Sequence, residues 1–128
     1  MSTNILRILI VGALLVHGVG HILGFWMPSR SWLMPNAGEP FLRTLSSILW
    51  VLAALGFVLS CLGFLDIVVP ADWWRPLAVV FALVSLLGLV LFWGTWPAFN
   101  TIGALSMNVA IMVTQLWLRW PPEDMFVK

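Results

Sequence analysis

Charged residues are scarce in this chain. Of its 128 residues, 9% are Asp, Glu, Lys or Arg and 62% are hydrophobic, whereas soluble domains carry about 25% charged residues. Six basic and five acidic side chains are too few to cover the surface of a water-soluble domain. Disorder is excluded as well, because disordered chains contain few hydrophobic and aromatic residues. The composition therefore predicts a membrane protein, and the net charge of +1 offers no field that would attract nucleic acid.

The sequence also lacks the residue sets of several enzyme classes. Cys61 is the only cysteine, which excludes the Cys-x-x-Cys pair that membrane disulfide oxidoreductases require. The chain offers no Ser/His/Asp set, no paired carboxylates within its apolar segments and no Gly-rich phosphate loop. Cys61 itself is expected to be a small apolar side chain of the second helix. These absences favour a protein that is not an enzyme.

The few charges separate long apolar segments. Uncharged stretches cover residues 8–29, 44–65 and 76–118, and a membrane-spanning helix needs about 20 apolar residues. The third stretch is long enough for two helices and is interrupted at residues 93–97, where Gly and Pro end a helix. We predict an all-α fold, an integral four-helix transmembrane bundle that forms one domain over residues 1–128, with helices at about 5–26, 45–69, 74–93 and 98–118.

The basic residues predict how these helices are oriented. Four fall at the end of the bundle that holds the chain termini and two at the opposite end, namely Arg7, Arg75, Arg119 and Lys128 against Arg30 and Arg43. The positive-inside rule then places both termini in the cytoplasm. Tryptophans flank both ends of the predicted helices, as is typical of the two membrane interfaces. We therefore expect a multi-pass protein of the cell's inner (cytoplasmic) membrane, with the lipid bilayer around it.

One connection is long, the predicted outer loop over residues 27–44. Pro28, Pro35, Gly38 and Pro40 exclude a continuous helix there. The apolar side chains of the loop suit either the membrane surface or the mouth of the bundle. Two interpretations remain open, an ordinary interfacial loop and a lid or partner-docking surface.

Two histidines lie within the first predicted helix. His17 and His21 are four residues apart, so they share one helix face at a distance of about 6 Å. Ionisable residues inside a membrane span are rare and are candidates for function. Three interpretations remain open: hydrogen bonds to neighbouring helices around a small polar cavity, contact with a quinone or another small ligand, and ligation of a transition metal or haem.

Metal ligation by His17 and His21 would need further donors. Zinc sites use at least three protein ligands, and the other predicted helices offer only Cys61. A haem held by two histidines would have to be shared between protomers, because both rings lie on one helix. The sequence therefore requires no cofactor.

The fourth predicted helix carries a polar stripe. Thr101, Asn108 and Gln115 recur every seven residues and so lie on one side of the helix. Measured from the helix midpoints, His17 and Asn108 lie at the same depth, about 3 Å from the bilayer centre. We therefore predict that His17 and Asn108 approach each other across the first and fourth helices. The candidate ligand-binding residues are His17, His21, Thr101, Asn108 and Gln115.

A second polar cluster is expected at the inner boundary of the membrane. Arg7, Asp66 and Arg119 all fall about 13 Å inward from the midpoints of their helices. Asp66 is the one acidic residue within a predicted helix. Two interpretations remain open, a salt bridge that sets the topology and a cytoplasm-facing proton or headgroup site.

Small residues predict where the helices approach one another. Burial from water does not drive association between helices in lipid, so close van der Waals contact must do so. The candidate close-packing positions are Gly20 and Gly24 in the first helix, Gly56 and Ser60 in the second, and Ala78, Ala82, Ser85 and Gly88 in the third. Gly18 and Gly20 also leave room beside the histidines.

Residues 6–25 resemble a known family. Arg7, the apolar run leading to His17-Gly18, and the segment from His21 to Phe25 are similar to the opening helix of DoxX-like membrane proteins. The position of His21 is typically lysine in that family, so the chain departs from the pattern there. The resemblance implies a small four-helix bacterial membrane protein linked to respiratory or quinone-dependent redox systems, often as a partner subunit. It supplies no catalytic residues.

Together these features predict a non-catalytic membrane subunit, or a binder of a small hydrophobic ligand of the quinone or lipid-like kind. The expected cavity is lined by His17, His21 and Asn108. The alternative is a metal- or haem-binding membrane redox protein that uses the two histidines. With either function we expect a protein partner or a homo-oligomer.

Overall fold

The computed structural model describes residues 3–122 and is helical throughout this part of the chain apart from its connections. The helices are α1 (Thr3–Gly20), which continues as the 3₁₀ segment η1 (His21–Trp26), α2 (Glu39–Phe64), the 3₁₀ turn η2 (Ala71–Trp73), α3 (Trp74–Leu91), α4 (Ala98–Met112) and the π-helical segment η3 (Val113–Trp117). Four helical stretches are long and apolar enough to cross a membrane. This confirms the prediction of an all-α fold with four such helices.

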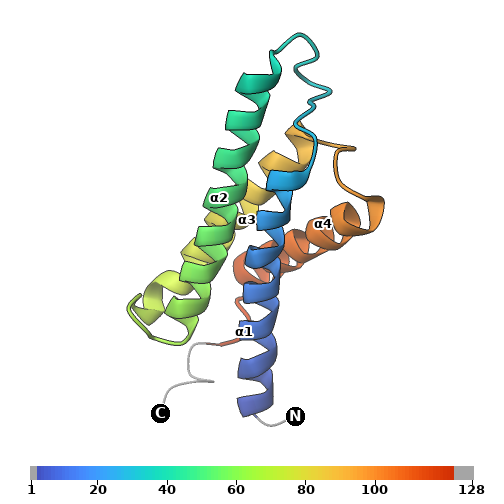
Figure 1. Cartoon of the computed structure of the whole chain (residues 1–128). Coiled ribbons are helices and arrows are strands. Elements are labelled where there is room, and N and C mark those ends of the chain that lie inside the picture. Colours follow the sequence, from blue (N-terminus) through green and yellow to red (C-terminus); the bar gives the residue numbers. More distant parts are fainter. Residues whose placement is uncertain (1–2, 123–128) are drawn as a thin grey trace.

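Three of the helices run side by side, and the fourth crosses them. Figure 1 shows α1, α2 and α3 alternating in direction along the long axis of the molecule, whereas α4 lies obliquely across the bundle. The helix α2 is the centre of the packing, because it contacts α1 and η1 on one side and α3 on the other. The helix α4 packs mainly on α3.

Glycines allow α2 and α3 to approach closely. A Cβ atom added to Gly56 of α2 would lie 1.8 Å from Cγ of Phe81, and one added to Gly88 of α3 would lie 2.7 Å from Cζ3 of Trp50. Ala78 and Ala82 of α3 are fully buried at the same contact. Of the expected positions of the second and third helices, Gly56, Gly88, Ala78 and Ala82 thus lie at the close contact between α2 and α3.

In the first helix the close approach is made by a different glycine. A Cβ atom on Gly18 would lie 3.0 Å from Cβ of Phe57, whereas one on Gly20 would have no heavy atom of another element within 4 Å. The Gly20-x-x-x-Gly24 spacing predicted a close helix contact at Gly20, and this prediction is wrong. Gly24 does form one, since its Cβ would lie 2.5 Å from Cδ1 of Trp50.

The helix α2 is shifted relative to its predicted bounds of 45–69. It begins at Glu39, because Pro40 occupies the first turn, where a missing N–H costs no hydrogen bond. The predicted loop 27–44 is therefore shorter by several residues. The helix ends at Phe64, since Asp66 and Val68 adopt left-handed backbone conformations with φ of 55° and 65°.

The remaining loop is fixed to the bundle by hydrogen bonds. Ser31 Oγ donates to the carbonyl of Leu91 at 2.6 Å, and Trp32 Nε1 donates to the carbonyl of Val90 at 2.7 Å. These carbonyls belong to the last turn of α3, where carbonyl oxygens have no N–H partner within the helix. Met34 also packs against the core at this end of the molecule. The loop thus caps α3.

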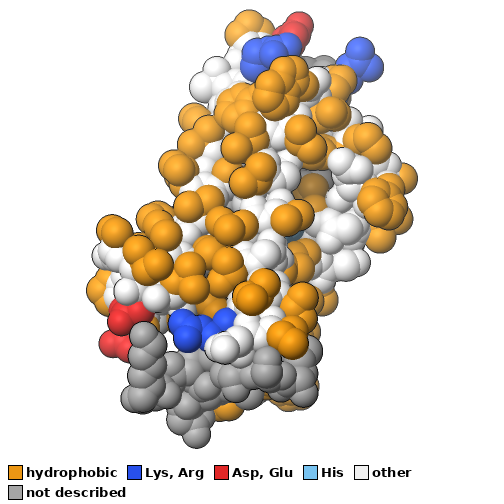
Figure 2. Space-filling view, turned by 60° about the horizontal axis from the view of Figure 1, so that its bottom comes forward, with side chains coloured by type: hydrophobic (Ala, Val, Ile, Leu, Met, Phe, Trp, Pro, Cys, Tyr) orange, Lys and Arg blue, Asp and Glu red, His pale blue; other side chains and the backbone are white. Residues whose placement is uncertain are grey.

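Charge and hydrophobicity are segregated on the surface. Figure 2 shows one face on which hydrophobic side chains cover the body of the molecule and charged side chains gather at its two ends. Six tryptophans are exposed near these ends: Trp26, Trp32, Trp73, Trp93, Trp117 and Trp120. Lys128, which was counted in the orientation, lies outside the described residues.

Candidate functional site

A chain of hydrogen bonds links α1, α3 and α4 within the bundle. His17 Nε2 lies 2.8 Å from Asn108 Oδ1, which confirms the predicted contact between the first and fourth helices. Asn108 Nδ2 donates to Ser85 Oγ at 2.7 Å, and Ser85 Oγ lies 3.0 Å from His21 Nε2. We call these four residues the polar chain. Ser85 and Asn108 are fully buried, so their polar atoms need these partners.

The change from α-helix to 3₁₀ helix turns His21 toward α2. In a 3₁₀ helix the residues i and i+3 eclipse each other, so His21 and Gly24 face the same way, and both are buried. The His21 ring stacks on Trp50 with centroids 5.7 Å apart and an interplanar angle of 10°. The close approach at Gly24 makes room for the same Trp50 indole.

Phe57 of α2 packs against both imidazoles. Its ring centroid lies 4.5 Å from that of His17 and 6.1 Å from that of His21, and Phe57 is fully buried. The two histidine rings meet edge to face with centroids 5.0 Å apart. Aromatic packing and hydrogen bonding together fix the position of each imidazole.

An apolar groove of about 390 Å³ lies between α1 and α4, beside the polar chain. Both histidines line it, together with apolar or small residues such as Gly20, Gly103 and Met107. Val16 and Phe99 at its rim are 74% and 88% exposed. The groove therefore opens on the apolar outer surface of the bundle. We refer to it as the α1–α4 groove.

Each histidine keeps one ring nitrogen without a hydrogen bond. The Nε2 atoms of His17 and His21 are engaged in the polar chain, and within residues 3–122 neither Nδ1 atom has a hydrogen-bond partner. The indole N–H of Trp96, which also lines the groove, is buried without an acceptor in this part of the chain. Trp96 lies edge to face with Trp50 at 5.4 Å.

The structure separates the three members of the predicted polar stripe. Asn108 joins the polar chain but is fully buried and does not line the groove. Thr101 is buried and donates to the carbonyl of Pro97 in its own helix. Gln115 lies beyond the end of α4, in η3, where its Oε1 accepts a hydrogen bond from Arg75 at 3.0 Å.

In the part of the chain that the structure describes, Asp66 forms no ion pair with Arg7 or Arg119. Asp66 Oδ1 accepts a hydrogen bond from the backbone N–H of Ala71 at 3.2 Å and so closes the turn between α2 and η2. The polar contacts at this end centre instead on Arg75, which donates to Gln115 and to the carbonyl of Pro121.

The donor set around the histidines does not fit a zinc site. Within the described residues no group of three or more His, Cys, Asp or Glu side chains is placed to hold a metal ion. Ligation through either Nε2 would also break a hydrogen bond of the polar chain. A haem shared between two protomers stays a prediction, which an absorption spectrum of the purified protein would test.

Sequence reasoning missed the role of Ser85 in this site. Ser85 was expected only as a small residue at a helix contact, yet it connects Asn108 to His21. The sequence does give one indication of this role. Ser60 and Ser85 are the two hydroxyl side chains near the middle of the second and third predicted helices. The position of Ser85 in the sequence does not predict how α3 is rotated about its axis, and this rotation directs Ser85 toward His21 and Asn108.

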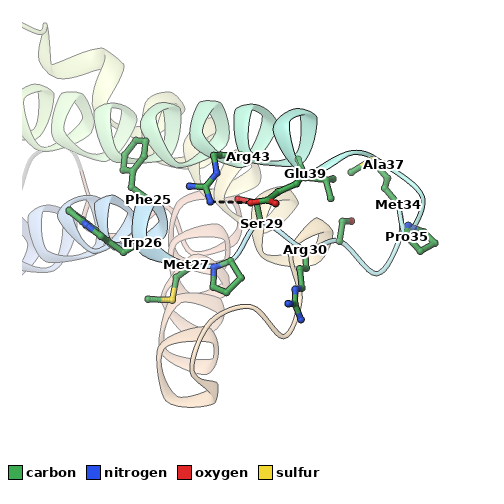
Figure 3. A pocket seen from close by; sticks show the side chains of 13 residues that line it. Phe25, Trp26, Met27, Ser29, Arg30, Met34, Pro35, Ala37, Glu39 and Arg43 are labelled. Atoms are coloured by element: carbon green, nitrogen blue, oxygen red, sulfur yellow. Dashed lines mark hydrogen bonds and ion pairs between the residues drawn. The ribbon is translucent and has the colours of Figure 1, made fainter.

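A second cavity, of about 700 Å³, lies between the end of η1, the loop and the start of α2. Figure 3 shows Arg43 pointing toward Glu39 at this cavity, and their ion pair measures 3.4 Å. Both side chains are more than half exposed, so this pair contributes little to stability. This cavity is bordered mainly by the loop and the start of α2, whereas both imidazoles border the α1–α4 groove.

Comparison with protein-family models, with curated proteins and with solved structures finds no match to this chain. The function must therefore be argued from the site itself.

Proposed function

We propose that this chain is a multi-pass membrane protein that binds a small, largely apolar ligand in the α1–α4 groove. In this proposal the ligand is quinone-like or lipid-like, its apolar part lies between α1 and α4, and its polar head meets His17 and His21. Both chain termini face the cytoplasm. The four apolar helices, the exposed hydrophobic surface between the charged ends and the tryptophans near those ends support insertion in a bilayer.

One observation carries the ligand-binding proposal. The groove has apolar walls, opens on the surface expected to face lipid, and is lined by two imidazoles whose hydrogen bonds in the described residues use only Nε2. Ligand sites typically combine apolar walls with a small number of polar groups that fix the orientation of the ligand. A purely structural pair of histidines would not require a groove of about 390 Å³ beside it.

The proposed role is non-catalytic. The described residues place no acid, base or nucleophile other than the imidazoles at the groove. Together with the resemblance of residues 6–25 to DoxX-like proteins, this favours a subunit of the bacterial inner membrane associated with a respiratory or redox system. A partner protein or a second copy would then cover part of the exposed apolar surface.

Two glycine substitutions test the groove without disturbing the packing. Gly103 lines the groove, Gly12 does not, and a Cβ atom on either would have no heavy atom of another element within 4 Å. Gly103→Leu should fill the groove, whereas Gly12→Leu adds the same side chain elsewhere. A short-chain benzoquinone, titrated into each variant in lipid nanodiscs, should quench tryptophan fluorescence saturably in the parent and in Gly12→Leu but not in Gly103→Leu.

Equal saturable quenching in all three proteins would contradict binding in this groove. Quenching that rises linearly in all three, as expected for partition into the bilayer alone, would contradict a site for quinones.

A further inference from the structure

The hydrogen bonds of the polar chain constrain where the protons of the two histidines lie. An amide oxygen only accepts and an amide nitrogen only donates. With Asn108 Oδ1 toward His17, the Nε2 atom of a neutral His17 must carry the proton. Asn108 Nδ2 then donates to Ser85, so the single hydroxyl hydrogen of Ser85 remains for His21.

The Ser85 hydroxyl has no other acceptor in the described part of the chain. Ser60 in α2 donates to the carbonyl four residues earlier, that of Gly56, at 2.7 Å, but Ser85 makes no such contact with its own helix. Its hydrogen is therefore satisfied only by donation to His21 Nε2. A neutral His21 that accepts at Nε2 carries its proton on Nδ1.

Turning the Asn108 amide over reverses every donor and acceptor but leaves the relation between the histidines unchanged. Asn108 Nδ2 would then donate to His17 Nε2, Ser85 would donate to Asn108 Oδ1, and His21 Nε2 would donate to Ser85. His17 would carry its proton on Nδ1 and His21 on Nε2. In both arrangements the two imidazoles are opposite tautomers.

We propose that the polar chain holds His17 and His21 in opposite tautomers, so that their Nδ1 atoms offer one hydrogen-bond donor and one acceptor to the α1–α4 groove. This inference rests on the proposed function for its ligand, and it specifies the ligand's chemistry. The matching head group carries a donor atom and an acceptor atom bonded to the same carbon, as a carboxamide or a protonated carboxylic acid does. A head that only accepts, as a quinone does, can bond to the Nδ1 that donates but leaves the other Nδ1 unsatisfied, so it should bind more weakly than a head with both groups.

The tautomers can be measured without any ligand. The chain contains two histidines, so ¹⁵N-histidine labelling gives two imidazoles, and protonated and unprotonated ring nitrogens resonate well apart. His17→Gln removes one set of signals and assigns the other. We expect one histidine protonated on Nε2 and the other on Nδ1 at a pH where both are neutral. Two identical tautomers would overturn the inference.

Ser85→Ala tests whether the polar chain causes this arrangement. The substitution removes one oxygen atom from a fully buried position and should leave the fold intact. It should also release His21 from its fixed tautomer, giving a mixture of its two forms while His17 stays bonded to Asn108. Unchanged opposite tautomers in Ser85→Ala would show that the polar chain does not set them.

Ligand selectivity is measured with two probes of equal chain length, decanamide and N,N-dimethyldecanamide, which lacks the N–H donors. We expect decanamide to bind about tenfold more tightly to the nanodisc-embedded protein, because the other probe leaves one Nδ1 unpaired. Equal saturable affinities would overturn the inference but leave a ligand site in the groove. Failure of both amides and of the benzoquinone to bind would contradict the proposed function, while the tautomer measurement would stand by itself.

Discussion

His17 on α1 and Asn108 on α4 are joined by a hydrogen bond of 2.8 Å between residues 91 positions apart. The bond holds α4 against α1 where the oblique course of α4 carries it past that helix (Figure 1). Beside it the two helices leave the α1–α4 groove. One contact thus helps to position both the fourth helix and the imidazole that lines the proposed site.

This contact should contribute measurably to stability. A double-mutant cycle with His17→Ala and Asn108→Ala should give a coupling free energy of about 0.6–1.7 kcal/mol, from the average to the maximum for hydrogen bonds between membrane helices. The measurement is reversible unfolding of the purified protein in mixed micelles. A cycle with His17→Ala and Thr101→Ala is the control, because Thr101 bonds within its own helix, and its coupling should be close to zero.

The contact between α2 and α3 should be intolerant of a single methyl group. Gly56→Ala places a Cβ atom 1.8 Å from Cγ of Phe81, so the helices must separate or the ring must move, at a cost of roughly 1–3 kcal/mol. Gly12→Ala meets nothing within 4 Å and makes the same change in helix propensity. The midpoint of thermal unfolding should fall for Gly56→Ala only, and equal midpoints would show that the helices do not approach closely at Gly56.

The loop should lose protection when its hydrogen bond to α3 is removed. Trp32→Phe keeps an aromatic ring but deletes the donor to the Val90 carbonyl. Because the bond is exposed, we expect faster amide exchange in residues 29–38 with only a small change in global stability, about 0.5–1.5 kcal/mol at most. Trp93→Phe, which changes a tryptophan that is 53% exposed, should leave exchange in the loop unaltered. Similar exchange in both variants would show that the Trp32 hydrogen bond does not hold the loop, which the Ser31 hydrogen bond and packing would then do.

Thiol labelling should report the orientation. Cys61 is buried and should not react in the folded protein, so single cysteines can be introduced at exposed positions. Asn36→Cys lies in the loop and Asp72→Cys in the turn between α2 and α3. In spheroplasts, a membrane-impermeant maleimide should label Asn36→Cys and spare Asp72→Cys until the membrane is disrupted. The reverse pattern would place the termini outside the cytoplasm.

The sequence predicted the number of helices and the contact between His17 and Asn108. Both depend on where residues lie along the helix axes and not on how the helices are rotated. Charges mark where apolar helices end, and equal depth in the bilayer brought His17 and Asn108 to the same level. The start of α2 departs from the predicted bound because proline, which interrupts a helix in its interior, fits the first turn, where Pro40 lies.

Contacts that depend on rotation about a helix axis were not predictable in this way. Ser85 bonds to His21 and Asn108 because α3 turns that side toward η1 and α4. Gln115 follows Asn108 by seven residues, but it lies in the π-helical segment η3 and bonds to Arg75 instead. The oblique course of α4 takes these two stripe residues to different neighbours.

The most direct test of the central claim maps where a lipid-soluble ligand sits. A decanamide that carries a photoreactive diazirine at the end of its chain is cross-linked to the protein in nanodiscs, with and without excess decanamide, and the labelled peptides are identified by mass spectrometry. The account predicts labelling that the competitor removes, concentrated on residues 13–23 of α1 and η1 and residues 99–107 of α4. Labelling that the competitor does not reduce, spread over exposed apolar positions of α2 such as Ile48 and Leu55, would contradict a ligand site between α1 and α4.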